Sequence, residues 1–271
     1  VAHGAALKGG ARAQAEASVT RASAVMEHMS QDVQLRLRTE AQLMSEDPRL
    51  KSTLATPGID EATIADVLQD LRKQTSAELL AVLTPTARVR AEVGASYLKG
   101  LDLSTSSVIR AAQAAGQPAV GTWVAGDQVL DVSAKAIRYD NQLVAYLVVG
   151  APMTEKALQR VSQVTGAGVA LIVAGKVTLG YPKEGGFPQA FAALAGEPAA
   201  FEAQTLALAG HEYIGQLTDV KNVMPTARLG VLMPAEDALA PFERARALAY
   251  VPTLVAVLFA AVAIIRGRLL R

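Results

Sequence analysis

The sequence predicts an α+β fold, with a long N-terminal helix, two tandem antiparallel-sheet modules and a C-terminal transmembrane helix. Three observations lead to this prediction. Residues 11–46 contain neither Pro nor Gly and are rich in strong helix formers. The same order of strands and helices occurs twice between residues 61 and 235, which indicates an internal repeat of architecture. The stretch 247–265 is apolar and carries no charge.

The composition excludes several classes of protein. Of the 271 residues, 51% are hydrophobic and 19% are charged, so the chain is too apolar to remain disordered. Lys and Arg together number 26 and Asp and Glu 25, a balance that argues against nucleic acid as a partner. The absence of cysteine excludes disulfides, thiol catalysis and thiolate metal sites.

We divide the chain into four parts from these patterns. Residues 1–60 form the long helix and a connector, and residues 61–152 form a first module, placed far from the membrane. Residues 153–235 form a second module, placed close to it, and residues 236–271 form a linker and the transmembrane helix.

Apolar residues recur along the long helix at a spacing of 4, 3, 4 and 4, which makes a narrow stripe. They are Ala22, Met26, Met29, Val33 and Leu37. A helix of 36 residues is about 54 Å long, more than one small domain needs. We therefore expect it to pair two chains into a homodimer as well as to cover its own domain. The alternative is a helix that lies on its own domain alone.

Two shorter helices are expected before the first strand. Asp47 precedes Pro48 and has the chemistry of a helix cap, and Asp60 caps a second helix over 61–75. From there the hydrophobic period changes from 3.6 to 2, which indicates strands.

Five strands are predicted in each module. In the first they cover 78–83, 88–93, 119–125, 128–138 and 142–150, with a helix over 105–115 that Gly116 ends. In the second they cover 168–174, 177–181, 201–208, 212–218 and 228–233, with helices over 154–165 and 188–194. We expect the helices of each module to pack on one face of its sheet and to leave the other face free for a pocket.

The 19 residues from Ala247 to Ile265 span about 28 Å as a helix, close to the thickness of a bilayer core. Three arginines follow this stretch and two precede it, which favours a cytoplasmic C-terminus and an outer location for residues 1–240. Because residues 1–10 contain no apolar export signal, we expect an earlier membrane helix and a later cytoplasmic part in a longer protein. The alternative is a buried core helix.

Three stretches with this order of elements resemble a known family. They are AELLAVLTPTARVRAEVG (77–94), LVAYLVVGAPMTEKAL (143–158) and GAGVALIVAGKVTLGY (166–181). With the long helix and the closing span, the layout resembles the double Cache, tandem PAS-like sensor region of bacterial transmembrane receptors.

This resemblance implies periplasmic or extracellular sensor modules anchored in the inner membrane. It also implies an output through a two-component kinase, a cyclase or a chemotaxis module. The arginine and aromatic pair that the amino-acid-binding members of the family use is absent, so amino-acid binding is not carried over.

No catalytic constellation is visible in the sequence. The three histidines, His3, His28 and His211, lie far apart, so no metal site is expected. Neither a phosphate-binding glycine loop nor a nucleophile elbow occurs. We therefore predict a protein that is not an enzyme and that needs no cofactor.

A small-ligand site is predicted in the first module. Residues 128–138 alternate, so that Ser133 and Lys135 belong to a polar row that also contains Asp131. We expect this row to line a pocket together with three side chains from neighbouring elements, which are Arg110, Trp123 and Tyr146. The alternative places Trp123 and Tyr146 in the core and the two cations on the surface. In the second module the candidates are Tyr181, His211 and Tyr213.

Two functions from different classes follow from these patterns. In the first, a small solute binds the first module and the change passes through residues 234–246 into the membrane helix and on to a cytoplasmic output. In the second, the chain is a membrane-anchored dimeric interaction or spacer module without a small-molecule ligand. A tail-anchored cytoplasmic protein is a third possibility, because it needs no export signal.

Overall fold

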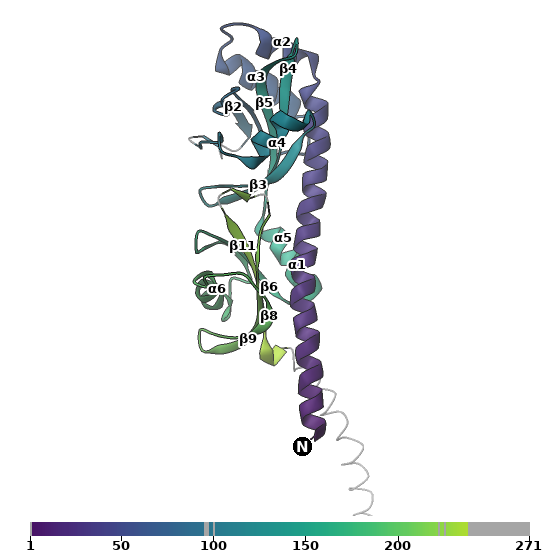
Figure 1. Ribbon diagram of the computed structural model, residues 1–271, viewed down its shortest axis with the longest axis vertical. Helices are drawn as coiled ribbons and strands as arrows, with labels where there is room; N and C mark the ends of the chain where they lie inside the picture. Colours follow the sequence, from purple (N-terminus) through teal and green to yellow (C-terminus); the bar gives the residue numbers. More distant parts are fainter. Residues whose placement is uncertain (1, 95–97, 100, 222, 225, 238–271) are drawn as a thin grey trace, which may run out of the picture.

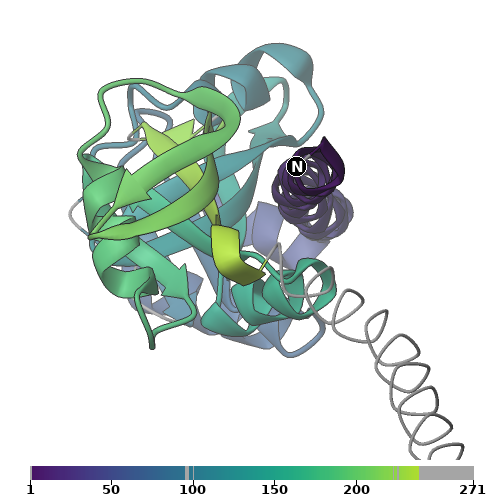
Figure 2. The ribbon, with the colours of Figure 1, turned by 90° about the horizontal axis from the view of Figure 1, so that it is seen from below.

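The computed structural model describes residues 2–94, 98–99, 101–221, 223–224 and 226–237. One helix runs the length of the molecule, and two antiparallel sheets lie one beyond the other along its side (Figure 1). Viewed nearly end-on, the helix lies beside the stacked sheets and not between them (Figure 2).

The long helix α1 covers Ala2–Ser45 and so begins nine residues before the sequence predicts. It passes through Gly9 and Gly10. Each glycine lowers helix stability by about 1 kcal/mol relative to alanine, a loss that a helix of this length tolerates. The predicted stripe is on its inner face and extends in both directions. Its buried members are Ala11, Ala15, Val19, Ala22, Met26, Leu37, Ala41 and Met44. The stripe is therefore covered by the protein's own two modules.

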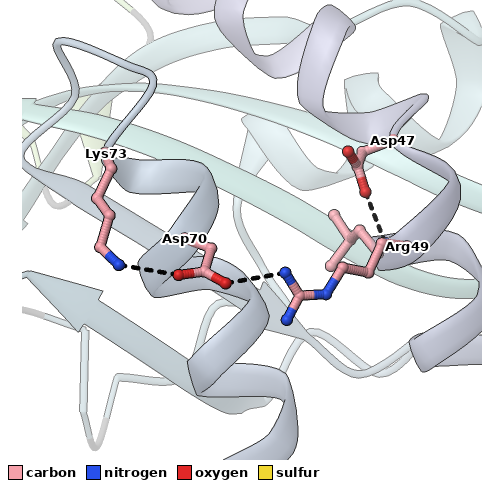
Figure 3. A network of polar contacts seen from close by, with 5 residues as sticks. Asp47, Arg49, Asp70 and Lys73 are labelled. Atoms are coloured by element: carbon pink, nitrogen blue, oxygen red, sulfur yellow. Dashed lines mark hydrogen bonds and ion pairs between the residues drawn. The ribbon is translucent and has the colours of Figure 1, made fainter.

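Helices α2 (Pro48–Ala55) and α3 (Glu61–Arg72) follow, with the predicted caps. The Asp47 carboxylate accepts a hydrogen bond from the backbone N–H of Leu50, and Asp60 accepts one from Thr63. Figure 3 shows Asp70 of α3 between Arg49 of α2 and Lys73, at 2.8 and 2.9 Å. These cations hold the pKa of Asp70 below its ordinary value, the Lys73 hydrogen bond most of all.

The first sheet has the strand order β10-β3-β4-β5-β1-β2. Its strands are β1 (Leu79–Leu83), β2 (Val89–Gly94), β3 (Ala119–Ala125), β4 (Gln128–Tyr139), β5 (Gln142–Pro152) and the two-residue β10 (Val223–Met224). Helix α4 (Ser107–Ala115) lies between β2 and β3 in the chain and ends at Gly116, which has a φ of 62°.

The second sheet has the order β7-β6-β11-β9-β8. Its strands are β6 (Gly168–Val173), β7 (Lys176–Tyr181), β8 (Phe201–Leu208), β9 (His211–Asp219) and β11 (Ala227–Pro234). Without β10, both sheets place their five strands, numbered along the chain, in the order 2-1-5-4-3. The predicted repeat of architecture is therefore confirmed.

Both faces of each sheet are covered, which corrects the expectation of one open face. On the first sheet α1, α2 and α3 pack on one face, and α4 packs on the other. On the second sheet α1 and α5 (Glu155–Thr165) share one face, and α6 (Phe187–Ala195) covers the other. The strands are apolar on both sides where they meet these helices, so each sheet contributes to two cores.

The two modules are joined at two points. Strand β10 comes from the connection between β9 and β11, yet it pairs in parallel with β3 of the first sheet, Val223 opposite Thr122. The tip of the β3–β4 hairpin, with Val124 and Val129, belongs to the apolar cluster of the second sheet. Neither contact is visible in the sequence, because each joins segments that are not neighbours along the chain, about 100 residues apart in the case of β10 and β3.

The predicted transmembrane segment 247–265 lies outside the described residues. Within the part of the chain that the structure describes, no helix combines the length and the apolar character needed to span a bilayer. Helix α1 begins, and β11 ends, at the same end of the molecule, beside the second sheet (Figure 1).

Candidate ligand-binding site between the long helix and the two sheets

Of the five residues predicted to line one pocket, Arg110 lies on helix α4 and the other four lie on two faces of the first sheet. Trp123 pairs with Leu130 and Tyr146 with Ala136, so both aromatic side chains belong to the face that α4 covers. Ser133 and Lys135 alternate with those partners and belong to the opposite face. The expectation that these side chains converge is therefore wrong, because the strand register separates them.

The face under α4 is filled by side chains. Trp123 and Tyr146 are each 1% exposed and pack with Val108 and Ile109 of α4. The indole N–H of Trp123 donates a hydrogen bond to the Ser106 hydroxyl at 3.2 Å. Arg110 is exposed on α4, away from this cluster. Burial raises the pKa of the Tyr146 hydroxyl.

The polar row of β4 faces α1. Lys135 is nearly buried, and its ammonium donates a hydrogen bond to the carbonyl of Gly116, where a cation also complements the C-terminal end of α4. Ser133 is fully buried, and its hydroxyl has no hydrogen-bond partner among the described residues. The row that the sequence assigned to a pocket is thus part of a seam between a helix and a sheet.

Asp131 is the centre of this seam. Asp131 is 4% exposed, and its carboxylate oxygen Oδ1 accepts three hydrogen bonds. The donors are Ser30 Oγ at 2.7 Å, Gln34 Nε2 at 2.9 Å and Thr122 Oγ1 at 3.1 Å. Two of these donors come from α1 and one from β3, so Asp131 connects the long helix to the first sheet.

Burial raises the pKa of the Asp131 carboxyl, although the hydrogen bonds from Gln34, Ser30 and Thr122 act in the opposite direction. The folded protein therefore binds this proton more tightly than the unfolded chain does. The stability that Asp131 contributes is fully present below its unfolded pKa of about 4 and is lost as the pH rises through the folded pKa.

We expect Asp131→Asn to remove this loss, because the amide keeps an oxygen acceptor and carries no charge. As the pH is raised from about 4 to 7, the difference in free energy of unfolding between this variant and the parent protein should shift in favour of the variant. Asp131→Ala leaves the three donors without an acceptor and should lower stability by about 1–3 kcal/mol. Urea denaturation at several pH values measures both effects. Equal losses in the two variants would contradict the assignment.

A cavity of about 430 Å³ lies beside this network, between α1 and the two sheets. We call it the junction cavity. Its lining comes from α1, from Thr122 of β3, from Met153 at the connection between the modules, and from β6, β9 and β11. Most of the side chains that line it from α1 are polar, including Ser23, Ser30 and Gln34. Both modules and the long helix therefore contribute to its walls.

The second-module candidates are partly brought together. His211 and Tyr213 line a hollow of about 340 Å³ near Gly186 and Pro234. Burial raises the pKa of Tyr213, and Glu236 raises it further. Tyr181 packs against the cluster on the opposite face of the second sheet. A third hollow, of about 710 Å³, lies along β2 and is lined by charges of both signs.

Sequence reasoning missed the junction cavity because its walls are distant in the chain. One signal was present: the polar side of the long helix contains Gln34, whose amide N–H donates to Asp131 of the first sheet. Among the described residues no group of three or more His, Asp or Glu side chains lies close enough to hold a metal ion.

Comparisons with solved structures identify the fold. The sensory domain of the Campylobacter jejuni chemoreceptor Tlp3 (CcmL) with isoleucine bound is 15% identical, and the match covers 86% of this chain and 96% of that one, with a TM-score of 0.53. The ligand-binding domain of the same receptor with L-norvaline is 16% identical, at 86% and 94% coverage and a TM-score of 0.52. The periplasmic domain of Vibrio cholerae LuxQ is 13% identical, at 80% and 99% coverage and a TM-score of 0.51.

These matches show that the chain has the fold of tandem PAS-like, double Cache sensory domains. No family model matches the sequence, and no curated protein sequence matches it either.

Proposed function

We propose that this chain is the extracytoplasmic ligand-sensing region of a bacterial membrane receptor. The observation that supports this most is the continuous helix α1, whose buried stripe belongs to the cores of both modules. A change in either module can therefore move the same rigid element. The fold comparisons support the same class, since the similar structures are a chemoreceptor sensory domain and a periplasmic receptor domain.

In this proposal residues 247–265 anchor the chain in the inner membrane, and both modules lie outside the cytoplasm. The described chain supports this arrangement, because α1 begins and β11 ends at one end of the molecule (Figure 1). Strand β11 leads through Pro234 towards the predicted span, so a shift of the second sheet would be passed directly to it. A ligand drives such a shift only by binding one of two conformations more tightly.

The proposal includes a small-molecule ligand. The similar Tlp3 structures hold isoleucine and L-norvaline, so small solutes of this size are the first class to test. It also includes a homodimer through α1, whose outer side exposes Leu35 and Leu43. The competing function is a dimeric spacer without a ligand, which the filled face under α4 favours.

We expect at least one compound from a library of amino acids, organic acids, amines, amides and sugars to stabilise the full 271-residue chain in detergent micelles. At 100 times its Kd such a ligand adds about 2.7 kcal/mol, which raises Tm by roughly 5–10 °C in a protein of this size. A thermal-shift screen measures this. If no class of compound raises Tm, the spacer function is the better account.

The orientation needs a separate experiment. Reporter enzymes that work only in the cytoplasm or only in the periplasm are fused after Arg271 and compared in cells. We expect activity from the cytoplasmic reporter alone. Activity of the periplasmic reporter would reverse the proposed orientation.

A further inference from the structure

We propose that the junction cavity binds a small neutral molecule with a hydrogen-bond donor, a hydrogen-bond acceptor and an apolar body, the chemistry of a lactam or a cyclic dipeptide. This inference rests on the proposed sensory function and names its ligand class and its place. Three features of the cavity wall support it, namely an unpaired donor, an unpaired acceptor and an uncharged apolar floor.

The unpaired donor belongs to Gln216 of β9. Its side chain is 7% exposed and lines the cavity. The amide oxygen accepts a hydrogen bond from Ser23 Oγ at 3.2 Å, whereas Nε2 donates to none of the described residues. Gln216 lines the cavity, and its amide N–H is not one of the buried side-chain groups that lack a hydrogen-bond partner. A carbonyl or hydroxyl oxygen on a ligand would accept a hydrogen bond from it in place of solvent.

The unpaired acceptor belongs to Gln34 of α1, on another wall of the same cavity. Its Nε2 is committed to Asp131 Oδ1, with longer contacts to the hydroxyls of Ser30 and Thr122. This fixes the orientation of the amide and leaves Oε1 without a donor among the described residues. A ligand N–H or O–H would complete it.

The charges around the cavity argue for a neutral ligand. The Asp131 carboxylate lies behind Ser30, Gln34 and Thr122 and does not itself line the cavity. The charged residues that do line it are exposed and of both signs, and they are Glu27, Asp219 and Lys221. An ionic ligand would therefore lose its hydration without meeting a buried opposite charge.

The apolar part of the lining favours a ligand with a hydrocarbon body. It includes Met26, Met153, Leu171 and Leu229. The two methionines are unbranched and adapt to different shapes. The volume, about 430 Å³, is within the range typical of small-molecule sites.

A ligand in this cavity would contact α1 and both sheets at once. Thr122, which lines it, also pairs with Val223 of β10 at the contact between the modules. Occupancy would thus hold the second module against the first sheet and the long helix. We expect bound ligand to slow amide hydrogen exchange in 119–125.

The test uses cyclo(L-Leu-L-Pro) and ε-caprolactam as probes, with L-leucine as a zwitterion of similar size, against the full 271-residue chain by isothermal titration calorimetry. We expect a neutral probe to bind and L-leucine to bind at least tenfold more weakly. Gln216→Leu should weaken binding of the neutral probe about tenfold, the worth of one hydrogen bond.

Two further variants keep the test decisive. Gln189→Leu makes the same chemical change at an exposed position on α6, on the far side of the second sheet, and should leave affinity unchanged. Thr218→Trp fills the cavity from an exposed lining position and should abolish binding without loss of folding.

The outcomes separate the two proposals. If the library screen finds a ligand whose affinity neither Gln216→Leu nor Thr218→Trp alters, the inference fails and the sensory function stands. If the neutral probes bind no better than L-leucine, the ligand class is wrong. If no compound of any class binds, both proposals fail.

Discussion

Replacing Trp123 with alanine is expected to lower the free energy of unfolding by about 3–5 kcal/mol, because the ring fills the core between the first sheet and α4. The variant also leaves the hydroxyl of the fully buried Ser106 without the hydrogen bond that it accepts from the indole N–H. Trp123 is the single tryptophan of the chain, so this variant has no tryptophan fluorescence to report unfolding. Its unfolding in urea is therefore followed by far-ultraviolet circular dichroism.

The matched control is Trp123→Phe, which keeps an aromatic ring and loses chiefly the hydrogen bond. We expect it to cost less than half as much as alanine. The comparison also tests the site predicted from the sequence. If Trp123→Ala cost less than about 1 kcal/mol, the ring would lie in an open pocket and a ligand-binding role for it would be favoured.

The second large effect concerns α1 as a link between the modules. Leu37→Ala removes a fully buried side chain from the first core and should cost about 2–5 kcal/mol. Val19 is in the core of the second module, 18 residues earlier and about 27 Å along the helix. If α1 unites the modules, Val19→Ala also shifts the unfolding transition of the first module.

Two probes measure this coupling. Fluorescence of Trp123 reports on the first module, and circular dichroism reports on the whole chain. We expect both midpoints to fall together in Val19→Ala. A fluorescence midpoint that stays at the parent value while dichroism shows an earlier phase would mean that the modules unfold separately. Val164→Ala is the matched control, since Val164 is 71% exposed on α5 and should change stability by less than about 0.5 kcal/mol.

Most of the elements were predictable because their signals are local. Strand β3 and strand β8 have the bounds that alternation predicts. The caps at Asp47 and Asp60 use side chains within three residues of the backbone N–H groups that they bind. Helix α4 ends at Gly116, whose lack of a side chain permits its φ of 62°. The repeat was visible because each module reuses the same sequence of such local signals.

The predicted ligand site was not recoverable in the same way. Alternation in β4 separates Asp131 and Ser133 from Leu130 and Val132, but it does not say which side faces a helix. Register decides that Trp123 lies opposite Leu130, and register depends on the pairing of β3 with β4 along their whole length. One residue of shift would have placed the ring beside Asp131.

The sequence by itself determined the long helix and the ten strands of the repeated units, because hydrophobic period, caps and turns act over a few residues. The sensor-like architecture came from the resemblance of this order of elements to a known family. The tertiary structure alone decided that both faces of each sheet are covered, that β10 joins the first sheet, and that Gln34 and Gln216 share one cavity. The last two features join segments about 100 and 180 residues apart, and only packing brings such segments into contact.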